Sequence, residues 1–577
     1  MPHAILAAMI VAAPRTLTDA LNSAPSARKF IISYGDGGEC ETVTFGEFRQ
    51  RSRVQAALLS DRGITAGERV IIIMPQGIPA MTAFAGAMML GAVPAFLAYP
   101  NFKVEPAKYR FGLQGVTTNL SARLVMIDEP FPGDMLEYIA LNETSQVVRV
   151  GNSAGPSEVE FAEPGINPDS LAFLQHSAGT TGLQKGVALT HGAVLRQVQA
   201  LAHALTIDGS SDRVYSWLPL YHDMGLIACF MLPLVCHVPV VMQSPLDWVM
   251  HPDTMLRAIS EHRCTLSWLP NFAFQFVARR GSPEEWSQFD LSSMRAFINC
   301  SEPVRAASMD EFYDAFHSNG LSGEAMQSSY AMAENVFAVT QSGISGRTQP
   351  ARVRASAKTF RAQHRVVPVN EEASDVMTFV SSGSLLPGYE VRIVSESGAE
   401  LDPGYVGEIL IKSDCLFDGY YNRPDLTQRV LVDGWYHSGD LGFFLEDELY
   451  VVGRKKDLLI VGGENIYPQD LEEIASAHPA IHDGRALAMG LYDPDLGTEA
   501  VLLVAEVERP ELLENAGAIE SEIRSQVVAA TGVSIRKIFL KPPKWIVKST
   551  AGKPARSTTQ DKLLQEHPEL QGERTGL

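Results

Sequence analysis

The chain has 577 residues, of which 46% are hydrophobic and 20% charged, a globular composition at a length that exceeds one hydrophobic core. Its 47 Lys and Arg residues against 67 Asp and Glu residues give a net charge of -20, which repels a phosphate backbone and argues against nucleic acid as a partner. Its six cysteines form no Cys-x-x-Cys pair, so neither a zinc site nor a redox motif is expected.

The apolar run at residues 4–13 has no Lys or Arg before it, unlike a signal peptide, and it is too short to cross a bilayer. We predict a first helix or a frayed extension there. No later stretch reaches the roughly eighteen consecutive apolar residues of a spanning helix. The sequence therefore predicts a cytoplasmic protein with no membrane span.

Short apolar strands alternate with helical stretches up to about residue 380. Strands are predicted at residues 70–74, 123–127, 171–175, 214–218, 265–269 and 296–298. Helices are predicted at residues 78–90, 193–205 and 308–316. Such alternation is typical of α/β layers with largely parallel sheets.

The pattern changes beyond residue 380, where turns rich in Gly, Pro and Asp separate the strands and indicate a β-rich subdomain. These strands are predicted at residues 389–394, 407–411 and 448–452. After a charged junction, the last part of the chain predicts a compact α+β unit. Its strands are predicted at 458–461, 485–489, 500–507 and 537–540, and its helices at 468–476 and 519–531.

The expected fold is therefore α/β. A large N-terminal domain, residues 1–452, consists of layered α/β subdomains plus the β-rich subdomain. A hinge at residues 453–457 connects it to a small, mobile α+β C-terminal domain, residues 458–577. The polar tail after Lys562 is expected to be loose.

A segment rich in glycine and threonine, His176-Ser-Ala-Gly-Thr-Thr-Gly-Leu-Gln-Lys-Gly186, follows a predicted strand. Its small residues let the backbone approach phosphate closely, and its hydroxyl and ammonium groups add donors. The candidate contacts are Ser177, Gly179, Thr180, Thr181, Gly182 and Lys185. The spacing is not that of a Walker loop, which ends in Gly-Lys-Ser/Thr. Taken alone, this segment could equally be a surface turn.

Four further motifs follow it in order. They are Tyr330-Ala-Met-Ala-Glu334, Tyr436-His-Ser-Gly-Asp440-Leu-Gly442, Gly453-Arg-Lys-Lys-Asp457 and Lys548-Ser-Thr-Ala-Gly-Lys553. With the phosphate segment they resemble the adenylate-forming superfamily of acyl-CoA synthetases, peptide-synthetase adenylation domains and firefly luciferase, over roughly residues 15–560. The resemblance implies an enzyme that uses ATP and Mg²⁺ to activate a carboxylic acid as an acyl-adenylate.

The resemblance also implies roles for the matching positions around the nucleotide. The segment at 177–186 would hold the β- and γ-phosphates. The adenine would be flanked by Ser301, Glu302, Pro303 and Tyr330. A tyrosine suits stacking because its ring is flat and its hydroxyl can stay in water. Asp440 would accept hydrogen bonds from the ribose hydroxyls, and Arg454 would face the same side.

Three further roles concern the reaction itself. Glu334 would bind Mg²⁺ as a hard oxygen ligand beside phosphate. Lys553 would be the catalytic lysine, because an ammonium between a carboxylate and the α-phosphate offsets their repulsion in the transition state. Lys456 would act as the hinge residue. Ala178 departs from the family pattern, which often has a hydroxyl residue there, so one phosphate contact is missing.

The segment Trp217-Leu-Pro-Leu-Tyr-His-Asp-Met-Gly-Leu226 resembles the fatty acyl-AMP ligase branch, whose members deliver acyl groups to carrier proteins. That branch carries an extra segment, expected here at about 349–379, which is thought to restrain the C-terminal domain and disfavour CoA. His222 would lie near the acyl carboxylate as a catalytic residue. The candidates for the acyl pocket are Asp223, Met224, Phe230, Trp268 and Phe274, and the apolar residues that could line a tunnel beside His222 also include Met231, Leu232, Phe272 and Phe276. At least half of these apolar residues are expected to be ordinary core.

Several functions stay open on this evidence. The first is activation of a medium- or long-chain fatty acid followed by transfer to the phosphopantetheine thiol of an acyl carrier protein. A fatty acyl-CoA synthetase, an amino acid-activating enzyme that uses Asp223 for the substrate ammonium, and a catalytically silent acyl-adenylate-binding protein are the alternatives. Because carriers are often acidic, a basic docking face is expected. Its candidates are Arg536, Lys537, Lys541 and Lys544.

Overall fold

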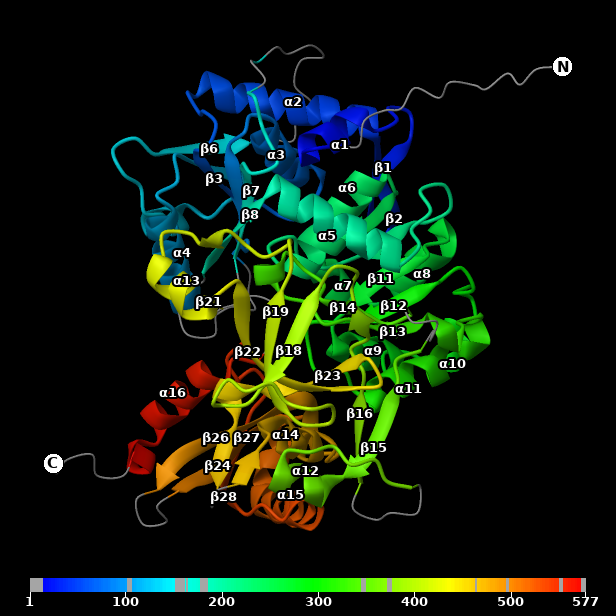
Figure 1. The fold of residues 1–577 in the computed structure, drawn as a ribbon, viewed down its shortest axis with the longest axis vertical. Coiled ribbons are helices and arrows are strands. Elements are labelled where there is room, and N and C mark those ends of the chain that lie inside the picture. Colours follow the sequence, from blue (N-terminus) through cyan, green and yellow to red (C-terminus); the bar gives the residue numbers. More distant parts are fainter. Residues whose placement is uncertain are drawn as a thin grey trace.

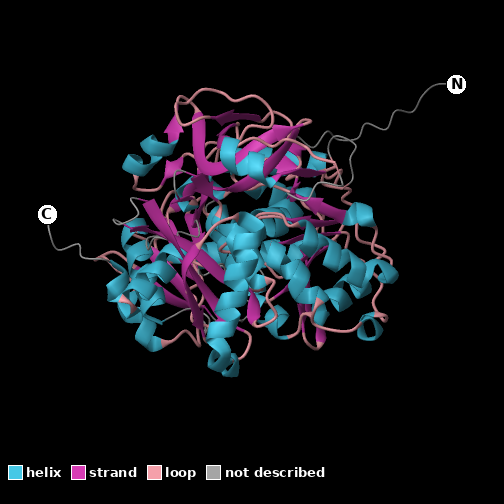
Figure 2. Ribbon diagram, turned by 90° about the horizontal axis from the view of Figure 1, so that it is seen from below, coloured by secondary structure: helices cyan, strands magenta, loops and turns pink. Residues whose placement is uncertain are grey.

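The computed structural model describes residues 14–100, 106–150, 161, 164–176, 185–343, 349–370, 376–461, 464–493, 498–548 and 554–571. The apolar run at 4–13 therefore lies outside the described residues. Figure 1 shows a large lobe that contains the N-terminal elements and a smaller lobe that contains the C-terminal ones, with the β-rich part between them. Seen from below in Figure 2, helices pack around the strands over much of the molecule.

Two parallel sheets form the centre of the large lobe. The seven-stranded sheet has the order β13-β12-β11-β9-β10-β1-β2, and only its edge strand β2 runs antiparallel to its neighbour. The four-stranded sheet has the order β4-β3-β5-β6 and is parallel throughout. The predicted alternation of strands and helices is thus confirmed.

The strands of the first sheet are β1 (Lys29–Gly35), β2 (Gly38–Thr44), β9 (Val214–Ser216), β10 (Val240–Gln243), β11 (Leu266–Leu269), β12 (Ala296–Asn299) and β13 (Met326–Ser328). Those of the second are β3 (Arg69–Ile73), β4 (Val93–Phe96), β5 (Leu124–Asp128) and β6 (Gln146–Val150). A third, antiparallel sheet has the order β20-β8-β7, with β7 (Leu171–His176), β8 (Gly186–Thr190) and β20 (Gly419–Tyr420).

Helices cover these sheets, and several begin at capping side chains. At the start of α2 the Thr44 hydroxyl accepts from the Glu47 backbone nitrogen, and the Glu47 carboxylate accepts from the Thr44 backbone nitrogen. α2 and α3 cross so closely that a Cβ on Gly86 would lie 2.5 Å from the Ser52 carbonyl oxygen, so only glycine fits there. The α-helices of this lobe are α1 (Leu17–Ser23), α2 (Phe45–Asp61), α3 (Ile78–Met89), α4 (Pro106–Leu120), α5 (His191–Ala204), α6 (Leu232–Cys236), α7 (Pro245–Met250), α8 (Asp253–His262), α9 (Asn271–Ala278), α10 (Pro283–Trp286) and α11 (Ala306–Phe316). The shorter helical segments are η1 (Gly133–Tyr138), the π-helix η2 (Met224–Met231), η3 (His317–Asn319), η4 (Gly323–Ala325) and η5 (Ala333–Asn335).

The β-rich part is an antiparallel sheet of order β18-β19-β22-β21, with β23 also paired to β22. Its strands are β18 (Glu390–Val394), β19 (Gly407–Lys412), β21 (Leu431–Val432), β22 (Trp435–Leu445) and β23 (Glu448–Arg454), with α13 (Pro424–Val430) before β21. A small pair joins β14 (Thr340–Gln341) to β17 (Ser384–Leu385). The predicted β-rich subdomain is confirmed.

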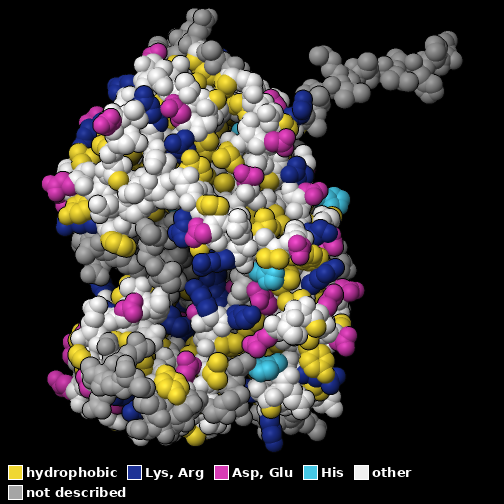
Figure 3. Space-filling model, turned by 60° about the vertical axis from the view of Figure 1, so that its left-hand side comes forward, with side chains coloured by type: hydrophobic (Ala, Val, Ile, Leu, Met, Phe, Trp, Pro, Cys, Tyr) yellow, Lys and Arg dark blue, Asp and Glu magenta, His cyan; other side chains and the backbone are white. Residues whose placement is uncertain are grey.

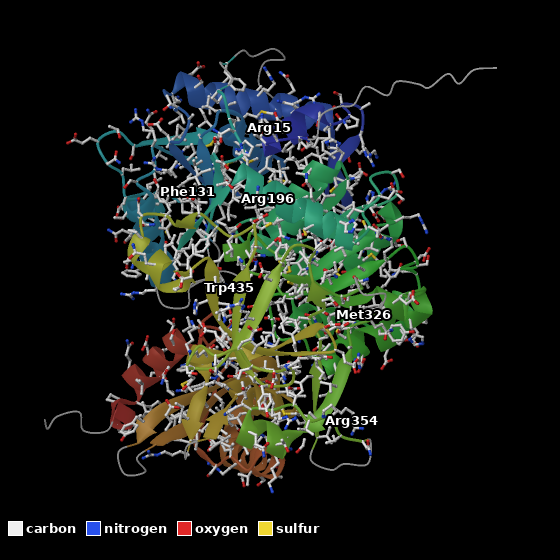
Figure 4. The ribbon with its side chains drawn as sticks, in the orientation of Figure 1. Arg15, Phe131, Arg196, Met326, Arg354 and Trp435 are labelled. Atoms are coloured by element: carbon white, nitrogen blue, oxygen red, sulfur yellow. The ribbon has the colours of Figure 1, made fainter. Side chains whose placement is uncertain are left out.

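The segment expected as an insertion forms a hairpin with a helix between its strands. Its elements are β15 (Arg352–Ser356), α12 (Ala357–Gln363) and β16 (Val376–Val380). In Figure 1 this hairpin reaches down beside the small lobe, and Figure 4 labels Arg354 of β15 at that level. That the segment is an insertion stays a prediction.

The small lobe has two hydrophobic clusters made only of its own residues. The domain boundary at 453–457 stays a prediction. Its elements are η6 (Lys455–Asp457), β24 (Leu459–Val461), β25 (Glu464–Ile466), α14 (Pro468–Ser476), β26 (Ile481–Asp493), β27 (Thr498–Val507), η7 (Pro510–Asn515), α15 (Ala516–Thr531), β28 (Ile535–Lys541), α16 (Arg556–Glu566) and η8 (Pro568–Gln571). The expectation of a loose tail after Lys562 is wrong through residue 571. α16 continues to Glu566 because Leu563 is fully buried in the lobe's core.

Candidate functional site

The candidate site lies at the carboxyl ends of the seven-stranded sheet, where parallel α/β sheets bind ligands. Ser301 follows β12 and Tyr330 follows β13, while His222 lies beyond the end of β9. The β-rich sheet contributes Asp440 from β22 and Arg454 from the end of β23, and these two residues are register partners.

Tyr330, Asp440 and Arg454 form one connected group. The Tyr330 hydroxyl donates to Asp440 Oδ2 at 2.7 Å, and Arg454 Nε lies 3.1 Å from Asp440 Oδ1. Burial and the Asp440 carboxylate raise the pKa of Tyr330 well above its ordinary value, and Asp440 raises the pKa of Arg454. The expectation that the tyrosine hydroxyl stays in water is wrong, because the Tyr330 side chain is buried and its hydroxyl is bonded to the carboxylate.

A second group joins Glu334 to Lys185 through a residue that the sequence did not single out. The Tyr420 hydroxyl donates to Glu334 Oε1 at 2.7 Å, and Lys185 Nζ lies 4.4 Å from the centre of the Tyr420 ring. Burial and Glu334 raise the pKa of Tyr420, and burial followed by Glu334 raises that of Tyr436. In the sequence, Tyr436 only begins a motif, and Tyr420 follows Gly419 at φ +138°, a turn position that indicates no role for its neighbour.

This second group suits a magnesium ion that is shared with phosphate. Glu334 supplies a carboxylate, and Lys185 brings positive charge to the same side. Within the described residues, no three His, Cys, Asp or Glu side chains form a group that could hold a metal. Magnesium is usually held by one or two carboxylates together with substrate phosphates, so a single glutamate fits it.

Two of the residues expected to flank the adenine contact neighbouring parts of the site. Ser301 has φ +71°, and its Oγ lies 3.8 Å from Met224 Sδ, so the loop after β12 contacts an acyl-pocket candidate. Glu302 Oε2 accepts a hydrogen bond from the Phe272 backbone nitrogen at 3.1 Å and so caps the start of α9. Pro303 is exposed beside them.

His222 and Asp223 are paired with each other. His222 Nδ1 lies 2.6 Å from Asp223 Oδ1, which also accepts from the Met224 backbone nitrogen at 2.8 Å. The π-helix η2 starts directly after them, a rare form that is frequent at functional sites. A Cβ on Gly225 would lie 2.3 Å from the Pro219 carbonyl oxygen, so only glycine allows this turn to close.

The other three apolar candidates are enclosed by the hydrophobic core, and their place in an acyl pocket stays a prediction. Phe230 is fully buried among aromatic side chains of the core, with Phe48 at 6.1 Å between ring centres, and Phe274 packs on Phe312 at 5.2 Å. Trp268 is also fully buried. These three residues occupy the core, which is where most large apolar side chains lie.

A second aromatic group is connected to the site candidates and includes Phe272, one of the residues expected to line the acyl tunnel. Trp217 stacks on Trp248 with ring centres 3.7 Å apart, and Phe272 stands edge-on to both at 6.3 Å. Phe272 is 40% exposed, and its backbone nitrogen bonds to Glu302 of the adenine-flanking loop. Its exposure next to polar site candidates is a signal that only the three-dimensional arrangement provides.

The phosphate segment can be followed only at its two ends. Ser177, Gly179, Thr180, Thr181 and Gly182 lie outside the described residues, and so does the catalytic candidate Lys553.

Burial shifts the pKa of two residues here, His176 at the start of that segment and the hinge candidate Lys456. His176, at the end of β7, is buried, and burial lowers its pKa to about 4, so it is neutral at pH 7. Burial and then Arg454 lower the pKa of Lys456, with a further contribution from Lys185. Figure 3 shows Lys and Arg side chains gathered in the hollow between the lobes, where an anionic ligand would be attracted.

Across the described part of the chain, no helix is both long and apolar enough to cross a membrane. A family model described as AMP-binding enzyme matches residues 17–421. The similar solved structures include a chain from a study of fatty acyl-adenylate ligases from E. coli and L. pneumophila. It is 28% identical with a TM-score of 0.87, over 96% of this chain and 98% of that one.

Three curated relatives are similar over nearly their whole length. A 4-hydroxyphenylalkanoate adenylyltransferase of Mycobacterium marinum is 30% identical over 95% of this chain and 91% of its own. The medium-chain-fatty-acid–[acyl-carrier-protein] ligase JamA of Moorena producens is 29% identical, with 94% and 93% covered. The long-chain-fatty-acid–AMP ligase FadD32 of Mycolicibacterium smegmatis is 30% identical, with 89% and 87% covered. The chain belongs to the AMP-binding enzyme family and, within it, to the fatty acyl-AMP ligase branch of acyl-adenylate-forming ligases.

Proposed function

We propose that this enzyme activates a medium- or long-chain fatty acid with ATP and Mg²⁺ as acyl-AMP and then transfers the acyl group to an acyl carrier protein. The observation that carries the proposal is the convergence of the two groups at the sheet end. Asp440, held by Tyr330 and Arg454, offers a fixed acceptor for ribose hydroxyls. Lys185 and Glu334, joined through Tyr420, offer a cation and a metal ligand for the phosphates.

The adenylation step needs a positive group between two anions. In the proposed mechanism a carboxylate oxygen of the acid attacks the α-phosphorus, and the bond to the bridging oxygen of pyrophosphate breaks. The magnesium ion, when bound, neutralises charge on the phosphates. Lys553 is proposed to stabilise the charge that develops at the α-phosphate, on the basis of its motif. Glu334 is proposed to hold the ion.

An apolar acid suits the site better than an amino acid. The Asp223 carboxylate, the group that would pair with a substrate ammonium, is bonded to His222 and to the Met224 backbone. Met224 at the start of η2 and the Trp217–Trp248 stack add apolar side chains in the same region. A fatty acyl chain is favoured by such walls, because burying each methylene contributes about 0.8 kcal/mol.

A carrier thiol as acceptor is supported by one relative and by the hairpin at 352–380. The relative JamA is a ligase for an acyl carrier protein. In this chain α12 contacts the small lobe, with the Phe360 and Tyr467 rings 5.1 Å apart. Such a contact would restrain the small lobe, as the branch's extra segment is thought to do. A fatty acyl-CoA synthetase is the second candidate.

The proposal is tested in two stages by product mass. The enzyme is first incubated with ATP, Mg²⁺ and a panel of fatty acids, for which we expect acyl-AMP and pyrophosphate. CoA or a holo carrier protein is then added to the preformed adenylate, and transfer to the carrier is expected. Efficient formation of acyl-CoA would favour the second candidate, and no acyl-AMP from any acid would favour a silent binding protein.

The lysine assignment has its own matched control. Lys553→Ala should abolish pyrophosphate release, whereas Lys537→Ala, an exposed lysine of the same lobe, should not change it. Normal adenylation by Lys553→Ala would contradict the assignment. Lys537 also serves the carrier question, because its ammonium lies over the Phe539 ring at 4.8 Å on the outer strand β28. If carrier docking uses this face, Lys537→Ala slows transfer alone.

A further inference from the structure

The loop that follows β12 continues directly into a contact between the two lobes. Arg305 stands two residues after Pro303, and its guanidinium forms an ion pair with Glu473 of α14 in the small lobe. Its Nη2 also donates to the Gln469 backbone carbonyl at 3.4 Å. Its positive charge acts to lower the pKa of the nearby Asp470 carboxyl, against the larger effect of burial. One arginine of the large lobe therefore meets the first two turns of a small-lobe helix.

The same loop is braced on its other side by α9. The Arg305 backbone nitrogen donates to Asn271 Oδ1 at 3.0 Å, and the buried Asn299 at the end of β12 donates to that same oxygen at 2.9 Å. Glu302 caps α9 through Phe272. A displacement of Arg305 would therefore change the positions of residues 301–303, because these hydrogen bonds hold the whole loop as one unit.

A second ion pair joins the lobes without touching this loop. Arg279 of α9 lies 2.6 Å from Asp483 of β26, and the two side chains are 48% and 42% exposed. The pair has the same charges and a similar exposure to Arg305 and Glu473, which are 28% and 51% exposed. It differs in two respects. Arg279 lies at the carboxyl end of α9, away from Asn271 and Phe272 at its start, and its guanidinium is also paired with Glu311 of α11.

We propose that Arg305 is a positioning residue that couples the adenine-flanking loop to the small lobe, so that docking of α14 on Arg305 favours ATP binding. The inference rests on the proposed function, because it takes residues 301–303 as the adenine contact. It adds that Glu473, on the opposite lobe, influences nucleotide affinity through Arg305. If the small lobe turns away at the predicted hinge for acyl transfer, this contact breaks and the loop is released.

Charge reversal on the small lobe tests the coupling without altering the nucleotide site. We expect Glu473→Arg to raise the KM for ATP roughly fivefold, the upper range for a partly exposed ion pair, with the KM for the fatty acid unchanged. The double variant Arg305→Glu/Glu473→Arg should restore the KM for ATP to within about twofold, because it restores the pair in reverse. Asp483→Arg is the matched control and should change the KM for ATP less than about 1.5-fold.

The outcomes separate this inference from the proposed function. A wild-type enzyme that forms no acyl-AMP contradicts the proposed function. With an active wild-type enzyme, an unchanged KM for ATP in Glu473→Arg overturns the coupling. An equal rise in Asp483→Arg also overturns it, because lobe docking in general would then be the cause. A failure of the double variant to recover ATP binding shows that Arg305 does not act through Glu473.

Discussion

Removal of one hydroxyl, in Tyr330→Phe, probes the group around Asp440. The hydroxyl donates to the Asp440 carboxylate at 2.7 Å in a buried setting. A hydrogen bond to a charged group contributes about 1.5–3 kcal/mol. The variant should therefore lower kcat/KM for ATP by roughly 10- to 150-fold if Asp440 must be held to bind the ribose. Because Arg454 still contacts the other carboxylate oxygen, we expect the lower end, about 10-fold.

The measurement is steady-state pyrophosphate release with ATP and the fatty acid varied in turn. The loss should appear in the kinetic constants for ATP, while the KM for the acid stays within about twofold of wild type. Tyr34→Phe is the matched control, since it removes the hydroxyl of another buried tyrosine that donates to a carboxylate, Glu261 Oε2 at 2.8 Å, between β1 and α8. On an Asp440→Asn background the effect of Tyr330→Phe should shrink, because the two residues share one interaction.

Two results would refute this reasoning. The first is a kcat/KM for ATP in Tyr330→Phe within about twofold of wild type. The second is an equal loss in Tyr34→Phe, which would assign the effect to general stability. An effect on the KM for the acid alone would place the tyrosine in the acyl site instead.

Four further substitutions give equally specific outcomes. Asp470→Asn should raise the thermal midpoint at pH 7.5. Burial raises the pKa of Asp470 to about 6, so the ionised carboxylate lowers the stability of the folded wild-type protein above that pH. The wild-type protein regains this stability as the pH falls from 6 toward 4, where the carboxyl group is protonated in the folded state. A lower midpoint for the variant at pH 7.5 would contradict this. Leu563→Ala should cost about 2–5 kcal/mol in urea unfolding of the small lobe, since the side chain is fully buried, and a loss below about 0.5 kcal/mol would show a loose tail. Phe230→Ala should lower the free energy of unfolding but leave the preference among fatty acids unchanged. Phe272→Ala, at a 40% exposed position, should shift that preference with little loss of stability. The reverse pattern of acyl-AMP products would show that Phe230 lines the pocket.

The strand and helix positions were accessible from sequence because they depend on local periodicity. The predicted helix at 468–476 coincides with α14, and the strand at 70–74 matches β3 to within one residue. The end of the chain was not accessible in this way. The polar surface of α16 hides a single buried leucine, and whether Leu563 finds a core depends on β26 and β27 arriving beside it.

By itself the sequence determined the family and the order of its motifs, because glycine, threonine and lysine spacings are properties of the local backbone. Only the tertiary structure decided which side chains meet. Tyr330 bonds to Asp440 across 110 residues and Tyr420 to Glu334 across 86, and no local pattern encodes such pairs. The same limit explains the acyl candidates: Phe230 and Phe272 are alike in sequence, yet one is enclosed by the core and the other is exposed beside the site, because burial depends on how distant elements pack.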